Sequence, residues 1–241
     1  MAPALSIVIP CYNEAGNIPL ILERLRAAVG SRRDVEVLLV NNGSKDNSTA
    51  VFSSELAKPG HEFARVVVVE VNQGYGFGIL SGLRAAQGQF LAWTHADMQT
   101  DPTDVLLGFD QLLKQPQPEQ CFLRGRRKAR PPLDAFFTFG MSIVGSLALG
   151  VWLHDINAQP KILHRSFFAT WIDPPRDFSL DLYALYTAKR AGLTILSRPV
   201  FFTKRIHGEA KGGGTLKGKW KLVKRTFAYI AKLRRELKRS N

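Results

Sequence analysis

Short apolar segments rich in β-branched residues alternate with longer amphipathic segments along the first half of the chain. Each apolar segment has the length of a buried strand, and each amphipathic segment has the length and periodicity of a helix. The expected strands are Leu5–Ile9, Val35–Val40, Arg65–Val71 and Gln89–Thr94, and the helices that follow them are Glu14–Val29, Asn47–Leu56, Phe77–Ala86 and Pro102–Leu113. This alternation predicts an α/β domain with a mostly parallel sheet and helices on both faces.

The pattern is looser in the second half. It predicts a strand at Cys121–Leu123, a basic loop at 124–130, a helix at Asp177–Ala191 and a strand at Leu193–Phe202. Leu133–Leu153 is apolar and long enough to span a bilayer, but it contains Asp134 and three glycines. A membrane span there would also place the strands before and after it on opposite sides of the membrane, although both are expected to serve one site. We therefore expect a helix or helical hairpin lying against the domain or the bilayer surface.

Composition limits the class of protein. The chain has 241 residues, 45% hydrophobic and 22% charged, which is enough for the core of one domain. It has only two cysteines, too few for a disulfide framework, and no charged-then-apolar leader at its start. We therefore expect it in the reducing cytosol.

Positive charge is concentrated at the C-terminus. The net charge is +13, and residues 211–241 hold 11 of the 33 Lys and Arg but only Glu236 of the 20 acids. Apolar residues recur there at helical spacing: Leu216, Trp220, Val223, Phe227, Ile230, Leu233 and Leu237. Such a stripe either packs on the parent domain or lies on anionic lipid, and the excess charge favours lipid. We expect a folded domain at 1–211, followed within 212–241 by a glycine hinge and a basic amphipathic helix that lies on the membrane surface. We expect no nucleic acid partner.

Polar residues or glycines follow each of the first four strands. They occupy 11–14, 41–44, 72–76 and 95–97. Ligands of open parallel sheets bind beyond the carboxyl ends of the strands, so these residues predict one site. The first strand leads into Pro10-Cys11-Tyr12-Asn13-Glu14 rather than glycines, which excludes the usual dinucleotide fingerprint. No phosphate loop of the Lys-Ser/Thr type is present either.

Asp97 is a single carboxylate just after the fourth strand. A buried strand can fix such a residue well enough to bind a divalent cation beside a diphosphate. Alternatively, Asp97 solvates the loop before the helix that begins near Asp101-Pro102.

The order of motifs resembles the family 2 glycosyltransferases. The resemblance rests on Val8-Ile9-Pro10-x-Tyr12-Asn13-Glu14, Asn42-Gly43-Ser44-x-Asp46-x-Ser48, Gly74-x-Gly76 to Gly82 to Ala86-x-Gly88, and Asp97-x-Gln99. The later segments 155–161 and 205–211 look like the branch of dolichol- and polyprenyl-phosphate sugar synthases. The resemblance implies a GT-A fold, a half-Rossmann-like sheet that binds a nucleotide sugar.

The resemblance also assigns a nucleotide-sugar site. It implies that Pro10, Tyr12 and Glu14 line the nucleoside pocket, and that Asn41 and Asn42 stand where many relatives carry two acids. An amide can accept or donate a hydrogen bond, so UDP, GDP and CDP all remain possible. Gly74 and Asp97 belong to this site, although the glycine series alone indicates a tight turn and close helix packing. Asp46 is better explained as a turn or cap residue than as a ligand.

The metal motif of relatives is often Asp-Ala-Asp with Gln two residues later, and here His95 replaces the first acid. The resemblance implies Mg²⁺ or Mn²⁺ held by Asp97, Gln99 and the diphosphate. His95 is either a softer metal ligand or a contact to ribose or diphosphate.

Positive side chains would stabilise the departing nucleoside diphosphate. The candidates are Arg124, Arg126, Arg205, His207 and Lys211. Asp181 is the first candidate for a general base, and Asp155 is the second. A sugar hydroxyl acceptor would need such a base, whereas an anionic lipid phosphate would not.

These inferences predict an inverting glycosyltransferase that moves a sugar from a nucleoside diphosphate to a lipid-phosphate or glycan acceptor. We expect it as a peripheral protein on the inner face of the membrane, in polysaccharide biosynthesis. The alternative is a catalytically silent GT-A module that binds anionic lipid or nucleic acid.

Overall fold

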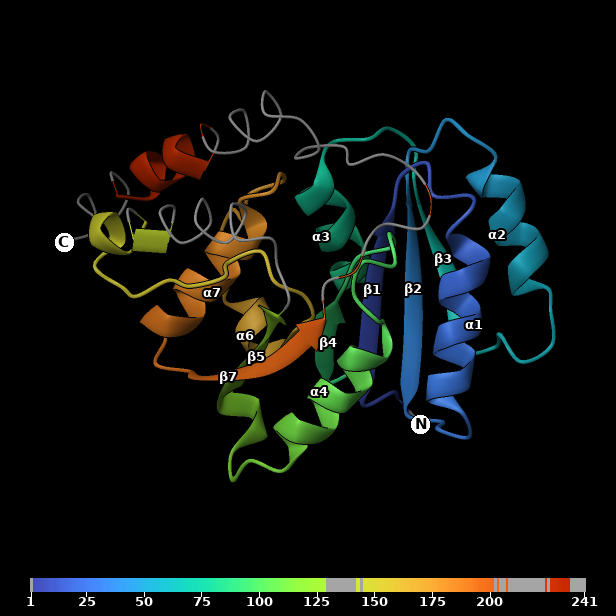
Figure 1. Ribbon diagram of the computed structural model, residues 1–241, viewed down its shortest axis with the longest axis horizontal. Helices are drawn as coiled ribbons and strands as arrows, with labels where there is room; N and C mark the ends of the chain where they lie inside the picture. Colours follow the sequence, from blue (N-terminus) through green and yellow to red (C-terminus); the bar gives the residue numbers. More distant parts are fainter. Residues whose placement is uncertain are drawn as a thin grey trace.

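The computed structural model describes residues 2–128, 142–143, 145–201, 203, 207, 224 and 226–234. Its centre is a seven-stranded sheet with the order β3-β2-β1-β4-β6-β5-β7 (Figure 1). The strands are β1 (Leu5–Cys11), β2 (Val35–Asn42), β3 (Ala64–Val69), β4 (Phe90–Trp93), β5 (Cys121–Lys128), β6 (Lys161–His164) and β7 (Thr194–Phe201). The α-helices are α1 (Ile18–Val29), α2 (Ser48–Leu56), α3 (Tyr75–Ala85), α4 (Thr103–Leu113), α6 (Arg165–Ala169) and α7 (Leu180–Arg190).

The first four strands are parallel, as the alternation predicted. The sheet is mixed because β6 runs antiparallel to both β4 and β5, while β5 and β7 are parallel. The sequence analysis missed β6. It has only four residues, begins with a lysine and therefore lacks the apolar run expected of a buried strand.

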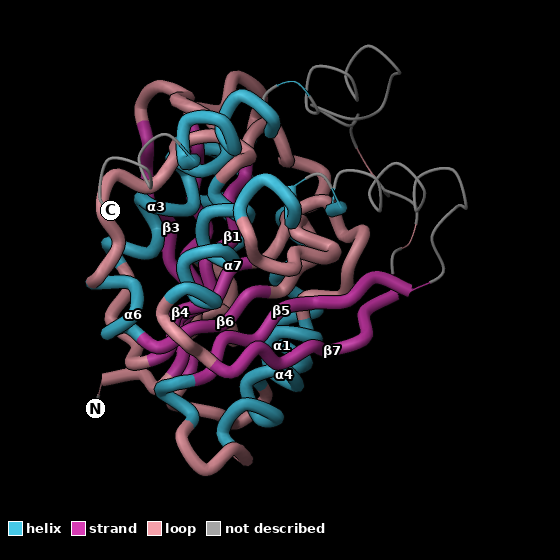
Figure 2. The backbone as a smooth tube through the Cα atoms, turned by 90° about the vertical axis from the view of Figure 1, so that its left-hand side faces the viewer, coloured by secondary structure: helices cyan, strands magenta, loops and turns pink. Residues whose placement is uncertain are grey.

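The predicted basic loop at 124–130 is wrong for residues 124–128, which continue β5. Backbone pairing with β7 extends from Cys121–Thr194 to Lys128–Phe201. Figure 2 shows these two strands projecting together beyond the rest of the sheet. Charged side chains are compatible with this extension because it is held by the backbone of β7 rather than by burial.

Each face of the sheet has its own core, which confirms helices on both faces. On one face, Leu5, Ile7 and Ile9 of β1 pack with the buried residues of α1 and α4. On the other, Val8 of β1 and Trp93 of β4 pack with α3 and α7. The alternation of side chains along β1 between the two cores is the period-two pattern of a strand buried on both sides.

The glycines of α3 permit close packing, as the sequence suggested. A Cβ on Gly82 would lie 2.4 Å from Val8 Cγ1, and one on Gly76 would lie 2.6 Å from the Asp177 carbonyl oxygen. Gly74 has a φ of 117°, and its Cβ would lie 2.5 Å from the Arg176 carbonyl oxygen. The loop before α3 can therefore pass against the segment before α7 only with glycine at this position.

Part of the C-terminal segment packs on the domain. Residues 226–234 are helical, and Ile230 and Leu233 are buried in the same core as α3 and α7. Most of the proposed hinge and helix, 212–223 and 235–241, lies outside the described residues, as does 133–141 of the apolar stretch. No helix among the described residues is both long and apolar enough to span a membrane.

We expect Gly82→Ala to destabilise the protein by about 1–3 kcal/mol, because the added methyl group overlaps Val8 and Val40 at the β1–β2 face. Urea denaturation measures this change. Gly145→Ala is the control, since its Cβ would meet Ile230 Cδ1 at 3.5 Å, an ordinary contact. Equal stability of the two variants would contradict this account of α3 packing.

Candidate nucleotide-sugar site

The loops after β1 and β2 are joined by hydrogen bonds. Asn13, with a φ of 54°, accepts a hydrogen bond from the Lys45 amide through Oδ1 at 2.7 Å and donates its own amide to Ser44 Oγ at 3.0 Å. The Glu14 amide donates to Ser48 Oγ at 3.2 Å, and the Glu14 carboxylate accepts from Asn17 Nδ2 at 2.6 Å. Pro10 near the end of β1, and Tyr12 and Glu14 in the loop after it, therefore lie at one ordered edge at the carboxyl ends of β1 and β2.

Asp46 and the two asparagines are used by the protein itself. Asp46 accepts hydrogen bonds from the amides of Ala15 and Ser48, which confirms its turn role. Asn41 uses both ends of its amide, accepting from the Ser44 amide and donating to Thr49 Oγ1. Asn42 Nδ2 donates to the Gly74 carbonyl oxygen at 3.0 Å. These side chains thus hold the β2 loop and connect it to the start of α3.

Asp97 lies in a tight turn at the tip of β4. It is 8% exposed, and its Oδ1 accepts the Gln99 amide at 3.1 Å across Met98, which has a φ of 57°. Gln99 in turn pairs with Thr203 after β7, where the Thr203 amide donates to the Gln99 carbonyl oxygen at 2.8 Å and Gln99 Nε2 donates to the Thr203 carbonyl oxygen at 3.3 Å. The turn is therefore fixed from both sides.

The predicted metal site has few charged side chains of the protein. Among the described residues, no group of three or more His, Cys, Asp or Glu side chains is placed to hold a metal ion. The His95 ring lies 5.8 Å from the ring of Tyr75, which stacks on Phe178 at 4.7 Å. Asp97 and Gln99 still offer oxygen atoms, the ligand type that Mg²⁺ and Mn²⁺ prefer, and diphosphate oxygens would have to complete the set.

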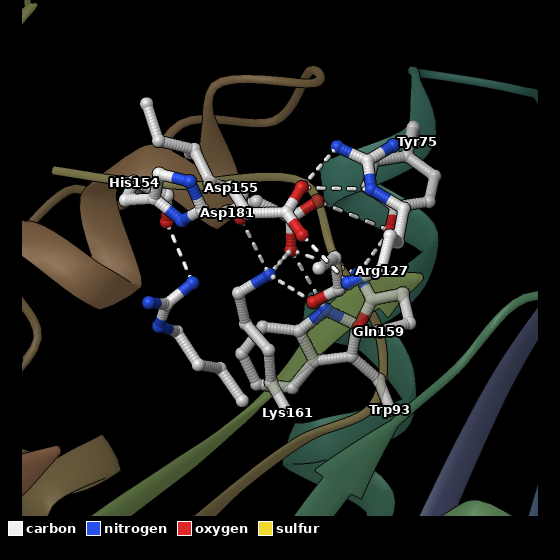
Figure 3. Close-up of polar contacts among 11 residues, drawn as sticks. Tyr75, Trp93, Arg127, His154, Asp155, Gln159, Lys161 and Asp181 are labelled. Carbon is white, nitrogen blue, oxygen red and sulfur yellow. Dashed lines mark hydrogen bonds and ion pairs between the residues drawn. The ribbon is translucent and has the colours of Figure 1, made fainter. Parts of the chain in front are cut away.

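Asp181, the first candidate base, lies at the centre of a buried network (Figure 3). It is 2% exposed, and Lys161 Nζ lies 2.9 Å from its Oδ1. Trp93 Nε1 and Gln159 Nε2 donate to the same oxygen at 3.1 and 3.0 Å, while the Tyr75 hydroxyl donates to Oδ2 at 3.4 Å. Four side chains from three segments, α3, β4 and residues 159–161, thus hold this carboxylate.

Lys161 is fully buried, and its ammonium group has three acceptors. Besides Asp181, they are the carbonyl oxygens of Ile156 at 2.8 Å and Ala158 at 3.1 Å. Burial lowers the pKa of Lys161, and the Asp181 carboxylate opposes that shift. Burial raises the pKa of Tyr75 well above its ordinary value, and the negative charge of Asp181 adds to this effect. The phenol therefore stays protonated and donates to the carboxylate.

Asp155, the second candidate base, is also in an ion pair. Its carboxylate accepts from Arg127 through the backbone amide at 2.7 Å and through the guanidinium nitrogens Nε at 2.8 Å and Nη2 at 2.5 Å. Arg124 Nη1 donates to the His154 carbonyl oxygen at 2.6 Å, and burial lowers the pKa of Arg124. Among the described residues, no carboxylate forms an ion pair with Arg124.

The other predicted phosphate-binding residues lie in different parts of the chain, and the structure describes only some of them. His207 lies beside the β1 loop, where its carbonyl oxygen accepts from Asn17 Nδ2 at 3.4 Å and its ring lies within 3.2 Å of a Cβ placed on Gly16. Arg126 is exposed on the projecting part of β5. Arg205 and Lys211 lie outside the described residues.

Sequence reasoning missed Lys161, Gln159, Trp93 and Tyr75 as partners of Asp181. A usable signal was present for Lys161, because a lysine that opens an apolar strand must either reach solvent or find a buried acid. Trp93 at the end of β4 gave no such signal, since an apolar strand commonly contains an aromatic residue.

Comparison with known proteins identifies the first part of the chain. Residues 6–118 match the model of the family described as glycosyl transferase family 2. This matched region is therefore similar to family 2 glycosyltransferases. The match covers β1 to α4 and includes Asp97, so the sheet edge described above lies within the family 2 region.

Curated relatives come from the polyprenyl-phosphate branch. The undecaprenyl-phosphate 4-deoxy-4-formamido-L-arabinose transferase of Serratia proteamaculans is 34% identical over 103 residues, which cover 42% of this chain and 31% of the relative. The protein of the same name from Pseudomonas paraeruginosa is 35% identical, with 42% and 30% covered. The chain thus matches about a third of the length of these relatives.

Solved structures show the fold over nearly the whole chain. Glucosyl-3-phosphoglycerate synthase from Mycobacterium tuberculosis, in complex with Mn²⁺, UDP and glucosyl-3-phosphoglycerate, has a TM-score of 0.72 at 19% identity, with 96% of this chain and 80% of that chain covered. A mannosyltransferase from Pyrobaculum calidifontis, in complex with GDP-mannose and Mn²⁺, has a TM-score of 0.65 at 18% identity, with 88% and 60% covered. The chain therefore has the GT-A fold of these structures.

We expect Lys161→Met to destabilise the protein by about 3–5 kcal/mol, because it leaves the Asp181 carboxylate buried without its cation. The double variant Lys161→Met/Asp181→Asn should lose less than the sum of the single variants, since the uncompensated charge is gone. Urea denaturation measures both.

The control is Arg24→Met, which removes an ion pair with Asp101 whose partners are 62% and 43% exposed. It should change stability by about 1 kcal/mol or less. Additive losses in the double variant would show that the Lys161–Asp181 pair is not the coupled unit described here.

Proposed function

We propose that this protein is an inverting glycosyltransferase that transfers a sugar from a nucleoside-diphosphate donor to a lipid phosphate. The observation that carries the proposal is the placement of Asp97 at the tip of β4, in a family 2 region whose β1 and β2 loops form an ordered edge beside it. The alternative of a catalytically silent lipid- or nucleic-acid-binding module has no support among the relatives and neighbours.

The donor would lie across the carboxyl ends of β1, β2 and β4. In this proposal, Pro10, Tyr12 and Glu14 contact the nucleoside, and Asp97 lies near the diphosphate. A divalent cation, Mg²⁺ or Mn²⁺, bound there with Asp97 and Gln99 would neutralise charge on the leaving diphosphate. The two solved neighbours contain Mn²⁺ with a nucleotide or nucleotide sugar, which supports this assignment.

Arg124 supports the same location for the leaving group. It is a half-buried cation without an ion-pair partner among the described residues, on β5 beside the β6 segment that carries Lys161. Positive charge held in this way stabilises a diphosphate as the bond to the sugar breaks. We propose Arg126, Arg205, His207 and Lys211 as further contacts of the phosphates or of an anionic acceptor.

The acceptor is inferred from the state of the two candidate bases. Asp181 is held by Lys161 and three further donors, and Asp155 is held by Arg127. A carboxylate engaged in this way is a poor base for a sugar hydroxyl, which favours a nucleophile that is already ionised. In the proposed reaction, a phosphate oxygen attacks the anomeric carbon, the bond from that carbon to the diphosphate oxygen breaks, and the nucleoside diphosphate leaves with the electron pair.

The names of the relatives agree with such an acceptor, since undecaprenyl phosphate is a lipid phosphate. We propose on this basis that the protein works as a peripheral protein at a membrane surface. Because its donor is a nucleotide sugar, we place the protein in this proposal on the inner face of the membrane, in polysaccharide biosynthesis.

We expect Asp97→Asn to reduce donor turnover by about 100-fold or more, because the variant removes the negative charge that holds the cation, and the cation in turn holds the diphosphate. A thermal-shift panel of UDP, GDP and CDP with Mn²⁺ first identifies the donor base, and hydrolysis of the matching nucleotide sugar is then measured. Asp101→Asn is the control, since Asp101 is exposed and can still cap α4 as an amide. Equal turnover by the two variants would refute the role of Asp97.

We expect transfer to undecaprenyl phosphate to exceed transfer to the neutral alcohol undecaprenol by at least about 100-fold, because the alcohol needs a base. Radiolabelled sugar extracted with each lipid measures the two rates. Similar rates would show that a base is available, and Asp181 and Asp155 would again be the candidates.

A further inference from the structure

Residues 147–152, here called loop 147–152, are the end of a short helix (147–149) and the turn that follows it (150–152), and hydrogen bonds close this segment at its base. Ser146 Oγ accepts the Leu153 amide at 2.7 Å, and the Val151 amide donates to the Ser146 carbonyl oxygen at 3.2 Å. Ser146 Oγ also donates to the Ser142 carbonyl oxygen at 2.6 Å. These hydrogen bonds close the turn at the end of the helix and fix both ends of loop 147–152.

The loop exposes large apolar side chains to solvent. Its sequence is Leu-Ala-Leu-Gly-Val-Trp, without a charged residue. Leu147 is 80% exposed and Trp152 is 57% exposed, whereas Leu149 and Leu153 are buried. Single exposed apolar residues are common, but a charge-free loop that exposes both a leucine and a tryptophan is typical of an interaction site.

Basic residues lie next to this loop. The helix at 226–234 packs against the segment that precedes it, where a Cβ on Gly145 would lie 3.5 Å from Ile230 Cδ1 and 3.9 Å from Leu153 Cδ1. Lys232 and Arg234 are exposed on this helix and Lys224 is exposed just before it, and Lys232 also forms an ion pair with Asp173 at 3.6 Å. Ile172 beside Asp173 is 84% exposed. Apolar and cationic groups are thus combined on neighbouring segments.

We propose that loop 147–152 inserts into the headgroup region of an anionic membrane and that Lys224, Lys232 and Arg234 contact the lipid phosphates around it. Tryptophan is favoured at the membrane–water interface, and basic side chains near the surface are attracted to anionic lipid. This combination fits a bilayer better than a protein partner, since clustered Lys is depleted in the cores of protein interfaces. The docking element differs from the free amphipathic helix that the sequence suggested, because Ile230 and Leu233 are buried in the domain.

The loop leads directly into the candidate site. Leu153 is followed by His154, whose carbonyl oxygen accepts from Arg124, and by Asp155, which pairs with Arg127. Docking through the loop would hold this part of the site at the level of the lipid headgroups. This role in acceptor delivery rests on the proposed function, whereas the docking itself does not.

The test is sedimentation of the full chain with vesicles of phosphatidylglycerol and phosphatidylcholine, compared with vesicles of phosphatidylcholine alone. We expect Leu147→Ser/Trp152→Ser to lower partitioning onto the anionic vesicles by about tenfold or more. Lys232→Glu/Arg234→Glu should lower it to a similar extent, and the natural chain should bind the zwitterionic vesicles weakly.

The matched control is Leu107→Ser/Leu113→Ser, which removes two exposed leucines from α4. It should bind anionic vesicles like the natural chain. Equal binding by the loop variant and this control would overturn the proposal, as would a dimer in solution that is lost only in the loop variant.

Hydrolysis of the nucleotide sugar without lipid should be unchanged in the loop variant. Vesicle binding by a chain that turns over no donor would refute the proposed function and leave the docking surface standing.

Discussion

The candidate site depends on one buried ion pair, between Lys161 at the start of β6 and Asp181 in the first turn of α7. Two charges of opposite sign can remain in an apolar interior only when each is paired and its other hydrogen-bonding positions are filled. Here the ammonium group has three acceptors and the carboxylate has four donors. The hydrogen-bond network around the pair joins the two parts of the chain, because Trp93 comes from β4 in the family 2 region, whereas Lys161 and Asp181 come from the part beyond it.

The contacts in this network also distinguish two chemical roles that the sequence alone cannot distinguish. An aspartate near a sugar site can act as a base or as an anchor, and its residue type is the same in both cases. Asp181 has the contacts of an anchor, and Tyr75 connects it to the α3 end of the nucleotide edge. The same reasoning applies to Asp155, whose contact with Arg127 was not expected from a segment that looked like a basic loop. Arg127 directs two guanidinium nitrogens to Asp155 Oδ1 and its backbone amide to Oδ2, so both carboxylate oxygens are held by this one residue.

The parallel part of the fold could be predicted from the sequence because its strands are buried on both faces and are nearly continuous apolar runs. β5 and β6 could be predicted only in part. Lys161 and the arginines of β5 break the apolar pattern, and their positions are determined by backbone pairing and by acids distant in the sequence. Asp46 was interpreted correctly as a turn-forming position from local spacing, whereas the metal-binding role of Asp97 stays a prediction. The roles of Asn41 and Asn42 required the structure, because an amide can serve a ligand or its own loop and the two uses leave the same residue in the chain.

The hydrogen bonds between Asn13, Ser44 and Lys45 have a consequence for affinity. Loops that must be ordered by a ligand lose chain entropy at the moment of binding, and that loss is subtracted from the contact energy. The loops after β1 and β2 hold each other in place through their own side chains. A nucleoside that enters this edge therefore meets a surface that is already shaped, and more of the free energy of its contacts is retained as binding strength.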